Sequence, residues 1–333
     1  MEYGLLRVPH QNSRYYDATA QLMINEFEII SNALKLNSKH LGYKTFGSLS
    51  LFCFEVDQVL KSDLVKALQR MATSFALFEV SGEWLKPLSH EEEMYFKSDI
   101  ASILKYSGKT NEDFTGLMIN VGVFASDFAG EFDAPLTIFD PMSGRGTTLY
   151  KALMSGYNST GVELQKQSCV EMNQYLKRYL KFHHYKHTAD HQTIVQKGKH
   201  IGTKYNVITA NDKEAFKTGD TRSMQFAQGD TLDSNLFHKK GHAHVLVTDL
   251  PYGVQHPAPK MMSLLEKASK TWFEMLKKGG VAVIAFNTYH LEKAELVKTF
   301  EKAGFKVLMD PVYDSFEHWV EQAVNRDILV LKK

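Results

Sequence analysis

Short apolar runs alternate with longer stretches of helical periodicity from about residue 111 to the end of the chain. The apolar runs predict strands at 136–139, 159–163, 223–227, 244–248, 280–286, 305–309 and 325–331. Apolar residues that recur every three or four positions predict helices at 113–123, 147–155, 166–182, 260–276 and 291–303. This alternation indicates an α/β fold with a doubly wound, mostly parallel sheet and helices on both of its faces. The last connection has no room for a helix of normal length, so we expect an antiparallel strand at the edge of this sheet.

The N-terminal part of the chain has a different pattern. Helical periodicity at 17–36 and 61–71 alternates with strand-like runs at 50–56 and 75–80, which predicts a smaller α/β or α+β domain. The segment 86–93 combines Pro87 with a cluster of charges, as expected near a boundary. We therefore divide the chain into an N-terminal domain, residues 1–108, and a C-terminal domain, residues 109–333.

Composition limits the class of protein. The chain has 333 residues and a formal net charge of +1, so a nucleic-acid partner must be held by a local basic patch. Its two cysteines, Cys53 and Cys169, lie far apart and indicate neither a metal site nor a disulfide framework. No apolar run approaches the roughly 20 residues that cross a bilayer, and no signal peptide is visible. We expect a soluble, cytoplasmic protein, and the sequence does not indicate its oligomeric state.

A glycine loop follows the first strand of the C-terminal part. Asp140 ends the strand, Gly144 and Gly146 lie in the loop, and Thr147 opens a helix. Glycines let a ligand approach the backbone without meeting a Cβ atom. The loop has neither the glycine spacing of dinucleotide sites nor the lysine of a P-loop. A short loop headed by an acid suits a cationic amino-acid group better than a pyrophosphate, although a turn that binds nothing has the same composition.

The nine residues from Asp140 to Thr148, Asp-Pro-Met-Ser-Gly-Arg-Gly-Thr-Thr, resemble motif I of class I methyltransferases. They are similar to the Asp-Pro-Phe-x-Gly-x-Gly-Thr form found in enzymes that methylate exocyclic amines of nucleic-acid bases. The resemblance implies a Rossmann-like methyltransferase fold with a seven-stranded sheet and S-adenosyl-L-methionine as the cofactor. It implies that the methionine part of the cofactor is held by Asp140, Met142, Ser143, Gly144, Gly146, Thr147 and Thr148.

Further cofactor residues follow from the same resemblance. Glu163 ends the second strand, where a carboxylate can accept both ribose hydroxyls, although acids also favour helix starts. Asp230, after the third strand, matches the acid that contacts adenine, although Gly-Asp turns are common. Phe114 and Thr115 resemble the helix that packs on the cofactor, where an aromatic residue is as readily part of the core.

A second loop, Asp249-Leu250-Pro251-Tyr252-Gly253, resembles motif IV of amino-methyltransferases, Asp/Asn/Ser-Pro-Pro-Tyr/Phe. Leu250 replaces a proline, which is tolerable because the group used there is a backbone carbonyl. An exocyclic amine is a poor nucleophile, since its lone pair is delocalised into the ring. The Asp249 side chain and the Leu250 carbonyl can accept its two hydrogens, and Tyr252 offers a face for base stacking. These residues and Pro251 are the predicted catalytic set, and no metal is required.

The form with a glycine after the tyrosine resembles guanine-N2 RNA methyltransferases related to the THUMP-containing tRNA enzymes. We therefore expect methylation of guanine N2 in tRNA or another RNA. The resemblance also implies that residues 109–333 are the catalytic domain and that residues 1–108 serve substrate recognition. The alternatives are a DNA adenine-N6 or cytosine-N4 methyltransferase and a protein that binds the cofactor without catalysis. The segment 177–204 contains seven Lys and Arg residues, five His and one Asp, with interleaved aromatic residues. This composition suits phosphate contacts and base stacking, and equally a helix end followed by a solvated hairpin.

Overall fold

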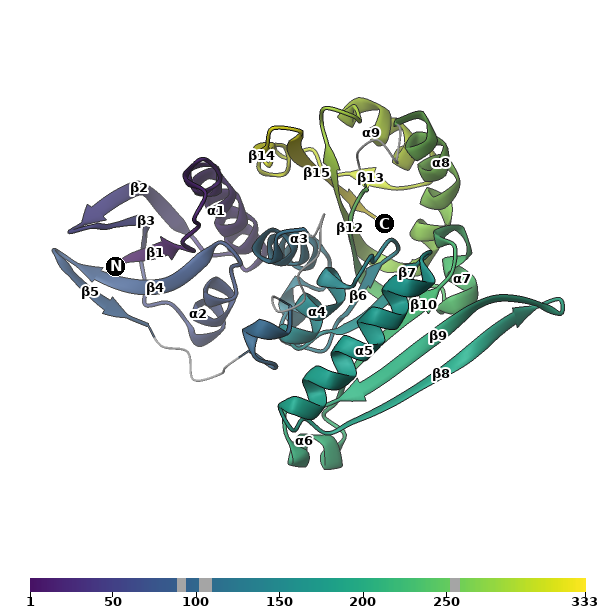
Figure 1. Cartoon of the computed structure of the whole chain (residues 1–333). Helices are drawn as coiled ribbons and strands as arrows, with labels where there is room; N and C mark the ends of the chain where they lie inside the picture. The colour runs from purple at the N-terminus through teal and green to yellow at the C-terminus, as the bar shows by residue number, and fades with distance from the viewer. Residues whose placement is uncertain (89–93, 102–109, 252–257) are drawn as a thin grey trace.

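The computed structural model of the chain describes residues 1–88, 94–101, 110–251 and 258–333, and its described strands form two sheets (Figure 1). The predicted boundary at residues 108 and 109 lies outside the described residues. No described helix is both long and apolar enough to cross a lipid bilayer.

The smaller sheet has five strands and is antiparallel throughout. Its order is β2-β3-β1-β4-β5, from Ser38–Phe46, Leu49–Val56, Glu2–Arg7, Ser74–Ser81 and Trp84–Pro87. Helices α1 (Ser13–Ala33) and α2 (Ser62–Gln69) lie between this sheet and the rest of the molecule (Figure 1). Of the two expected arrangements, this is the α+β one. The sequence did not predict β1, β2 and β5, because β2 is largely exposed and polar and β5 has only four residues.

The larger sheet contains all seven strands that the sequence predicts. They are β6 (Thr137–Asp140), β7 (Asn158–Glu163), β10 (Arg222–Gln228), β11 (Ala243–Asp249), β12 (Leu276–Asn287), β13 (Lys306–Val307) and β15 (Val324–Lys332). Strands β12, β11, β6, β7 and β10 are neighbours in that order and parallel. Strand β15 is antiparallel, as expected, but the prediction that it lies at the edge was wrong. The two-residue strand β13 pairs with its C-terminal end and occupies the edge instead.

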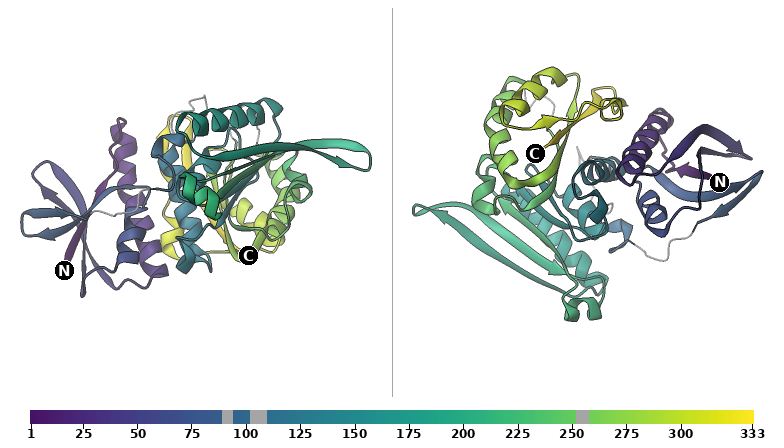
Figure 2. Two further views of the ribbon diagram at one scale, coloured as in Figure 1. Left: turned by 90° about the horizontal axis from the view of Figure 1, so that it is seen from below. Right: turned by 180° about the vertical axis from the view of Figure 1, so that it is seen from behind.

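Three further strands extend this sheet to ten. Strand β14 (His318–Glu321) pairs with β15, and β8 (His187–Gln196) and β9 (Lys199–Thr209) add a long hairpin beside β10. The basic segment 177–204 covers the end of α5 and most of this hairpin. The hairpin projects from one side of the molecule in every view of Figures 1 and 2.

Helices cover both faces of the larger sheet. On one face lie α3 (Glu112–Ala125), α4 (Thr147–Met154) and α5 (Lys166–Phe182), and on the other α8 (Ala258–Met275) and α9 (Lys293–Lys302). Short helices α6 (Lys213–Thr218) and α7 (Ser234–Phe237) flank β10. Val245 and Val247 of β11 pack in the core on the α3 face of the sheet, and Leu246 packs in the core on the α8 and α9 face. Burial on both faces explains why the central strands are continuous apolar runs.

The two sheets share one hydrophobic core through α1 and α3. Phe27 of α1, Phe54 of β3, Leu117 of α3 and Val283 of β12 belong to the same buried cluster. A buried carboxylate reinforces this junction. Glu26 of α1 accepts hydrogen bonds from Asn120 of α3 and from the turn between α2 and β4. The N-terminal part is therefore packed against the C-terminal part rather than tethered to it.

Candidate functional site

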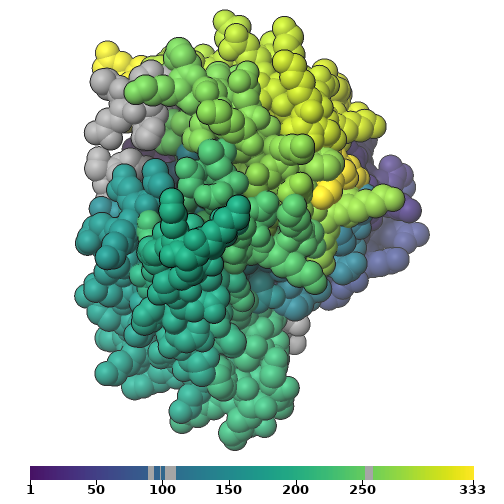
Figure 3. Space-filling model, turned by 90° about the vertical axis from the view of Figure 1, so that its right-hand side faces the viewer, coloured from purple at the N-terminus to yellow at the C-terminus, as the bar shows by residue number. Residues whose placement is uncertain are grey.

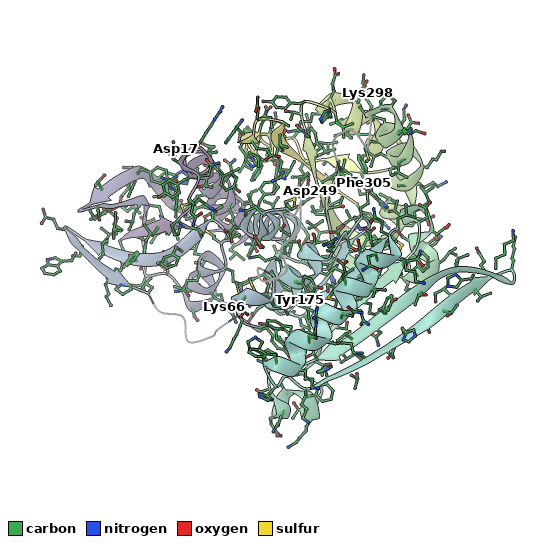
Figure 4. All side chains as sticks on the ribbon, in the orientation of Figure 1. Asp17, Lys66, Tyr175, Asp249, Lys298 and Phe305 are labelled. Atoms are coloured by element: carbon green, nitrogen blue, oxygen red, sulfur yellow. The ribbon has the colours of Figure 1, made fainter. Side chains whose placement is uncertain are left out.

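Four acidic residues lie at the carboxyl edge of the parallel strands. Asp249, Asp140 and Glu163 are the last residues of the neighbouring strands β11, β6 and β7, and Asp230 follows the end of β10. Ligands of doubly wound sheets bind at this edge. The structure thus brings the four sequence-predicted acids to one edge, in the order Asp249, Asp140, Glu163 and Asp230. Figure 4 labels Asp249, which lies beside α3.

Asp140 is buried, and no described cation forms an ion pair with it. Its Oδ1 accepts the backbone N–H of Met142 at 3.0 Å. Burial raises the pKa of the Asp140 carboxyl to about 6, and hydrogen bonds from the Thr148 hydroxyl and the Met142 amide offset only part of this effect. A cationic amine placed here would favour the charged carboxylate. This chemistry fits the amino group of S-adenosylmethionine.

The glycine loop between β6 and α4 has left-handed backbone at both glycines, with φ of 53° at Gly144 and 88° at Gly146. A Cβ at Gly146 would lie 2.6 Å from the sulfur of Met172, whereas the space beside Gly144 is open. Ser143 fastens the loop to β7, since its N–H and its hydroxyl donate to the carbonyl of Val162 at 2.9 and 3.3 Å. Only the Gly144 side of the loop therefore leaves room for a ligand.

Glu163 and Asp230 differ in their surroundings. The carboxylate of Glu163 accepts the backbone N–H of Gly144 at 2.9 Å and that of Gln165 at 2.7 Å. Burial raises its pKa, and these two amides oppose the effect. Each oxygen keeps a further lone pair, so the residue can still accept ribose hydroxyls. Asp230 is exposed and accepts the N–H of Leu232 at 2.9 Å, so a ligand has free access to it.

Several predicted cofactor residues are held in the interior. Thr147 and Thr148 are buried in the first turn of α4, and the Thr115 hydroxyl donates to the Asn111 carbonyl of its own helix at 3.0 Å. Phe114 is 1% exposed and belongs to the core cluster that joins the two sheets. Its ring lies 4.9 Å from the guanidinium carbon of Arg326 and 5.1 Å from the ring of His318. The structure therefore places Phe114 against the residues that surround Asp249.

Asp249 has two different carboxylate oxygens. Oδ2 accepts the Thr110 hydroxyl at 2.7 Å and lies 3.4 Å from the Arg326 guanidinium. Oδ1 is buried and has no hydrogen-bond partner in the described part of the chain. A buried acceptor of this kind is costly unless a donor reaches it, and an incoming amine N–H is such a donor. Leu250 is buried and its N–H donates to the Ala285 carbonyl, whereas Pro251 is half-buried. Tyr252 lies outside the described residues.

Sequence reasoning did not identify Thr110 and Arg326. Neither belongs to a motif, and Arg326 is 77 residues from Asp249 along the chain. The Arg326-Asp327 pair at the start of an otherwise apolar strand was the available signal, because buried charges require partners. Within the described ranges, no group of three or more His, Cys, Asp or Glu side chains has the geometry of a metal site.

This sheet, its two helical layers and the acid-bearing loops define a class I S-adenosylmethionine-dependent methyltransferase. The chain belongs to the family described as the RMKL-like methyltransferase domain, which it matches over residues 130–309, more than half of its length. The chain is therefore an enzyme of the methyltransferase class, and S-adenosylmethionine is its cofactor.

Other comparisons give only distant likenesses. No curated protein matches the chain. Among solved structures, a TehB-like SAM-dependent methyltransferase from Corynebacterium glutamicum is 14% identical, with 60% of this chain and 80% of that chain covered and a TM-score of 0.36. A putative RNA methyltransferase from Pyrococcus horikoshii is also 14% identical, with 70% and 92% covered and a TM-score of 0.37. An RNA methyltransferase from Salinibacter ruber in complex with S-adenosyl-L-homocysteine is 13% identical, with 67% and 90% covered and a TM-score of 0.33.

Proposed function

We propose that this enzyme transfers a methyl group from S-adenosylmethionine to an exocyclic amine of a nucleic-acid base, with guanine N2 in tRNA or another RNA as the acceptor. The observation that carries the proposal is the buried Oδ1 of Asp249, which accepts no hydrogen bond from any described residue. It belongs to a carboxylate whose other oxygen is held by Thr110 and Arg326. A carboxylate held in this way is fixed in place, and its Oδ1 can still accept a hydrogen bond from an amine N–H.

The chain's own residues position the amine. Asp249 Oδ1 accepts one amine hydrogen and the Leu250 carbonyl accepts the other, which turns the nitrogen lone pair away from the base ring. Pro251 stiffens the loop that follows the strand. Asp249 then takes up the proton that the methylated amine releases. The cofactor, when bound, supplies an electrophilic methyl group on a sulfonium sulfur.

The proposed cofactor contacts follow the edge of the sheet. Asp140 holds the methionine amino group, the backbone at Gly144 lines the methionine part, Glu163 accepts the ribose hydroxyls and Asp230 contacts the adenine amine. The N-terminal part, residues 1–108 in our division, serves substrate recognition. In support, Tyr15 of α1 contacts His318 with ring centroids 5.9 Å apart, and His318 contacts Phe114 beside Arg326. Helix α1 thus reaches the buried side chains that pack beside Arg326, the partner of Asp249.

The acceptor is tested by comparing nucleosides from cells with and without the gene. We expect mass spectrometry to show loss of N2-methylguanosine from tRNA or another RNA, and its return when the wild-type gene is restored. Restoration with an Asp249→Ala gene is the matched control and should not return it. An unchanged RNA profile together with loss of N6-methyladenine or N4-methylcytosine from DNA would make the enzyme a DNA methyltransferase. Cell fractionation tests the expected cytoplasmic location.

A further inference from the structure

The β8–β9 hairpin extends past the carboxyl edge of its sheet. Strand β9 pairs with β10 from Thr209, opposite Arg222, to Thr203, opposite Gln228. Beyond Thr203 the two hairpin strands continue together to a two-residue turn at Lys197 and Gly198, with φ of 48° and 77°. Two consecutive positive φ values are the mark of a type I′ turn, which makes a regular hairpin rather than a loose loop.

Its free end lies on the same side of the sheet as the candidate site. Residue 203 is level with the end of β10, and the five residues from there to the turn span about 17 Å at the rise of a β-strand. Four strand spacings separate β9 from β11, which amounts to about 19 Å. The tip is therefore several nucleotides away from a base placed at Asp249, and it can contact a polymer that carries the base.

The hairpin is anchored at its base and exposed at its tip. Tyr205 stacks on Phe226 of β10 with ring centroids 5.0 Å apart, and Ile194 and Ile201 pack against the core cluster that contains Phe237. Lys204 donates to the Phe237 carbonyl at 2.9 Å, so it belongs to this anchor. From Gln196 to His200, every residue is exposed. Figure 3 views the molecule from the side toward which the hairpin projects in Figure 1, and the hairpin stands in the foreground.

Positive charge is concentrated on the hairpin and on the end of α5 that precedes it. Seven Lys and Arg residues and one Asp give the segment 177–204 a formal charge of +6, whereas the whole chain carries +1, so the remaining residues sum to −5. Lys177, Lys181, Lys186, Lys197 and Lys199 are all exposed, and none has an ion pair with a described residue. Polyanions are attracted to such a stripe and repelled by the rest of the surface.

The composition of the stripe favours a nucleic acid over a protein partner. Most side chains along β8 are exposed and polar, and its few apolar residues, Ala189, Ile194 and Val195, do not form one apolar face that could be buried against a protein. Lysines bind phosphates through charge, and exposed rings such as Phe182, His184 and His191 can stack on unpaired bases. Splayed, unpaired bases are typical of folded RNA.

We propose that the β8–β9 hairpin is an RNA-binding arm that holds the phosphate backbone of the substrate away from the nucleotide being methylated. The choice of RNA rests on the proposed function. The contact itself rests on the geometry and charge of the hairpin. Because the arm lies far from Asp249, it contributes to affinity for the polymer and not to the chemical step.

The test replaces the two lysines of the tip in the full-length protein. Lys197→Asn suits the left-handed backbone of the turn, and Lys199→Gln keeps a similar side-chain length. The matched control, Lys298→Gln with Lys302→Gln, removes two exposed lysines from α9, where Figure 4 labels Lys298 on the far side from the hairpin. Binding to a fluorescent tRNA transcript and to duplex DNA is measured by anisotropy over a range of salt concentrations.

We expect the tip variant to bind the transcript about tenfold more weakly, with a salt slope smaller by about 1 to 2, and the control to match the wild type. If the tip variant and the wild type bind the transcript with equal affinity and equal salt dependence, the hairpin is not an RNA-binding arm. If the wild type binds duplex DNA more tightly than the transcript, and the tip variant loses this binding, the partner of the arm is DNA and not RNA. The binding assay does not depend on methyl transfer. If the wild type binds RNA through the tip but methylates no RNA, the proposed function is refuted and the RNA-binding arm is not. Where the wild type does methylate RNA, the tip variant should raise KM and leave kcat unchanged.

Discussion

The guanidinium of Arg326 lies 3.4 Å from Oδ2 of Asp249, and this pair joins strand β15 to the carboxyl end of β11. Both side chains are shielded from water, with 4% and 13% of their surfaces exposed. The aromatic ring of Phe114 covers the guanidinium from the other side. In the proposed mechanism Arg326 acts through Asp249 as a positioning residue, because it holds the carboxylate so that Oδ1 faces the incoming amine.

Replacing Arg326 should lower kcat more than it changes cofactor affinity. Arg326→Met keeps much of the side-chain volume but leaves Asp249 with Thr110 as its described partner, and we expect kcat to fall about tenfold. Arg326→Lys should give intermediate activity, because lysine restores the charge without the planar fork. Steady-state methyl transfer and calorimetric binding of S-adenosylmethionine separate the two effects. Full activity in Arg326→Met would refute the positioning role.

Asp249→Asn should abolish most of the chemical step and spare cofactor binding. The amide keeps the size of the side chain and one acceptor for Thr110, but it loses the charge and presents an N–H₂ donor toward an amine donor. We expect transfer to fall by about 10² to 10³, as when one preorganised polar group is removed from an active site. The dissociation constant for S-adenosylmethionine should stay within about twofold. Asp314→Asn, at an exposed carboxylate paired with Lys293, serves as the control and should behave as wild type.

Local patterns in the sequence predicted the strands and acidic residues of the candidate site, but not the residues that contact Asp249 from distant parts of the chain. The helical period predicted α5 with its observed limits, and the buried strands with their terminal acids were predicted because each lies within one apolar run. The Arg326 contact was not predictable in this way, since it depends on β15 being inserted between β12 and β13. Phe114 shows the same limitation, because helical periodicity places it on a buried face without indicating which partner covers it.

Cofactor affinity should depend on pH through Asp140. Burial raises the pKa of this carboxyl to about 6 in the free protein, and a cationic amine binds only its charged form. Affinity is therefore full above pH 7 and should weaken by up to about tenfold for each pH unit below 6. Calorimetry from pH 8 to pH 5 measures this. Asp140→Asn should bind weakly with no slope near pH 6, whereas Asp230→Asn should keep the slope. A slope that persists in Asp140→Asn would assign the titration to another group.

The junction between the two sheets should depend on Glu26. Its carboxylate accepts hydrogen bonds from the Ala72 amide, the Thr73 amide and hydroxyl and the Asn120 side chain, at distances from 2.6 to 3.1 Å. Burial raises the pKa of Glu26, and the four donors oppose this effect. Glu26→Ala would leave these donors without an acceptor in a dry interior, so we expect the free energy of unfolding to fall by about 3 to 5 kcal/mol.

Urea unfolding followed by tryptophan fluorescence and by circular dichroism checks this prediction of lower stability. Because Glu26 joins α1, the α2–β4 turn and α3 within one core, we expect a single transition that both probes report at the same urea concentration. Glu28→Gln is the matched control on the same helix, since Glu28 is partly exposed and its carboxylate lies 3.6 Å from the His40 ring. Glu28→Gln should unfold at the same urea concentration as the wild type. Two separate wild-type transitions would instead mean that the N-terminal part folds independently, and that Glu26 stabilises only one of the two units.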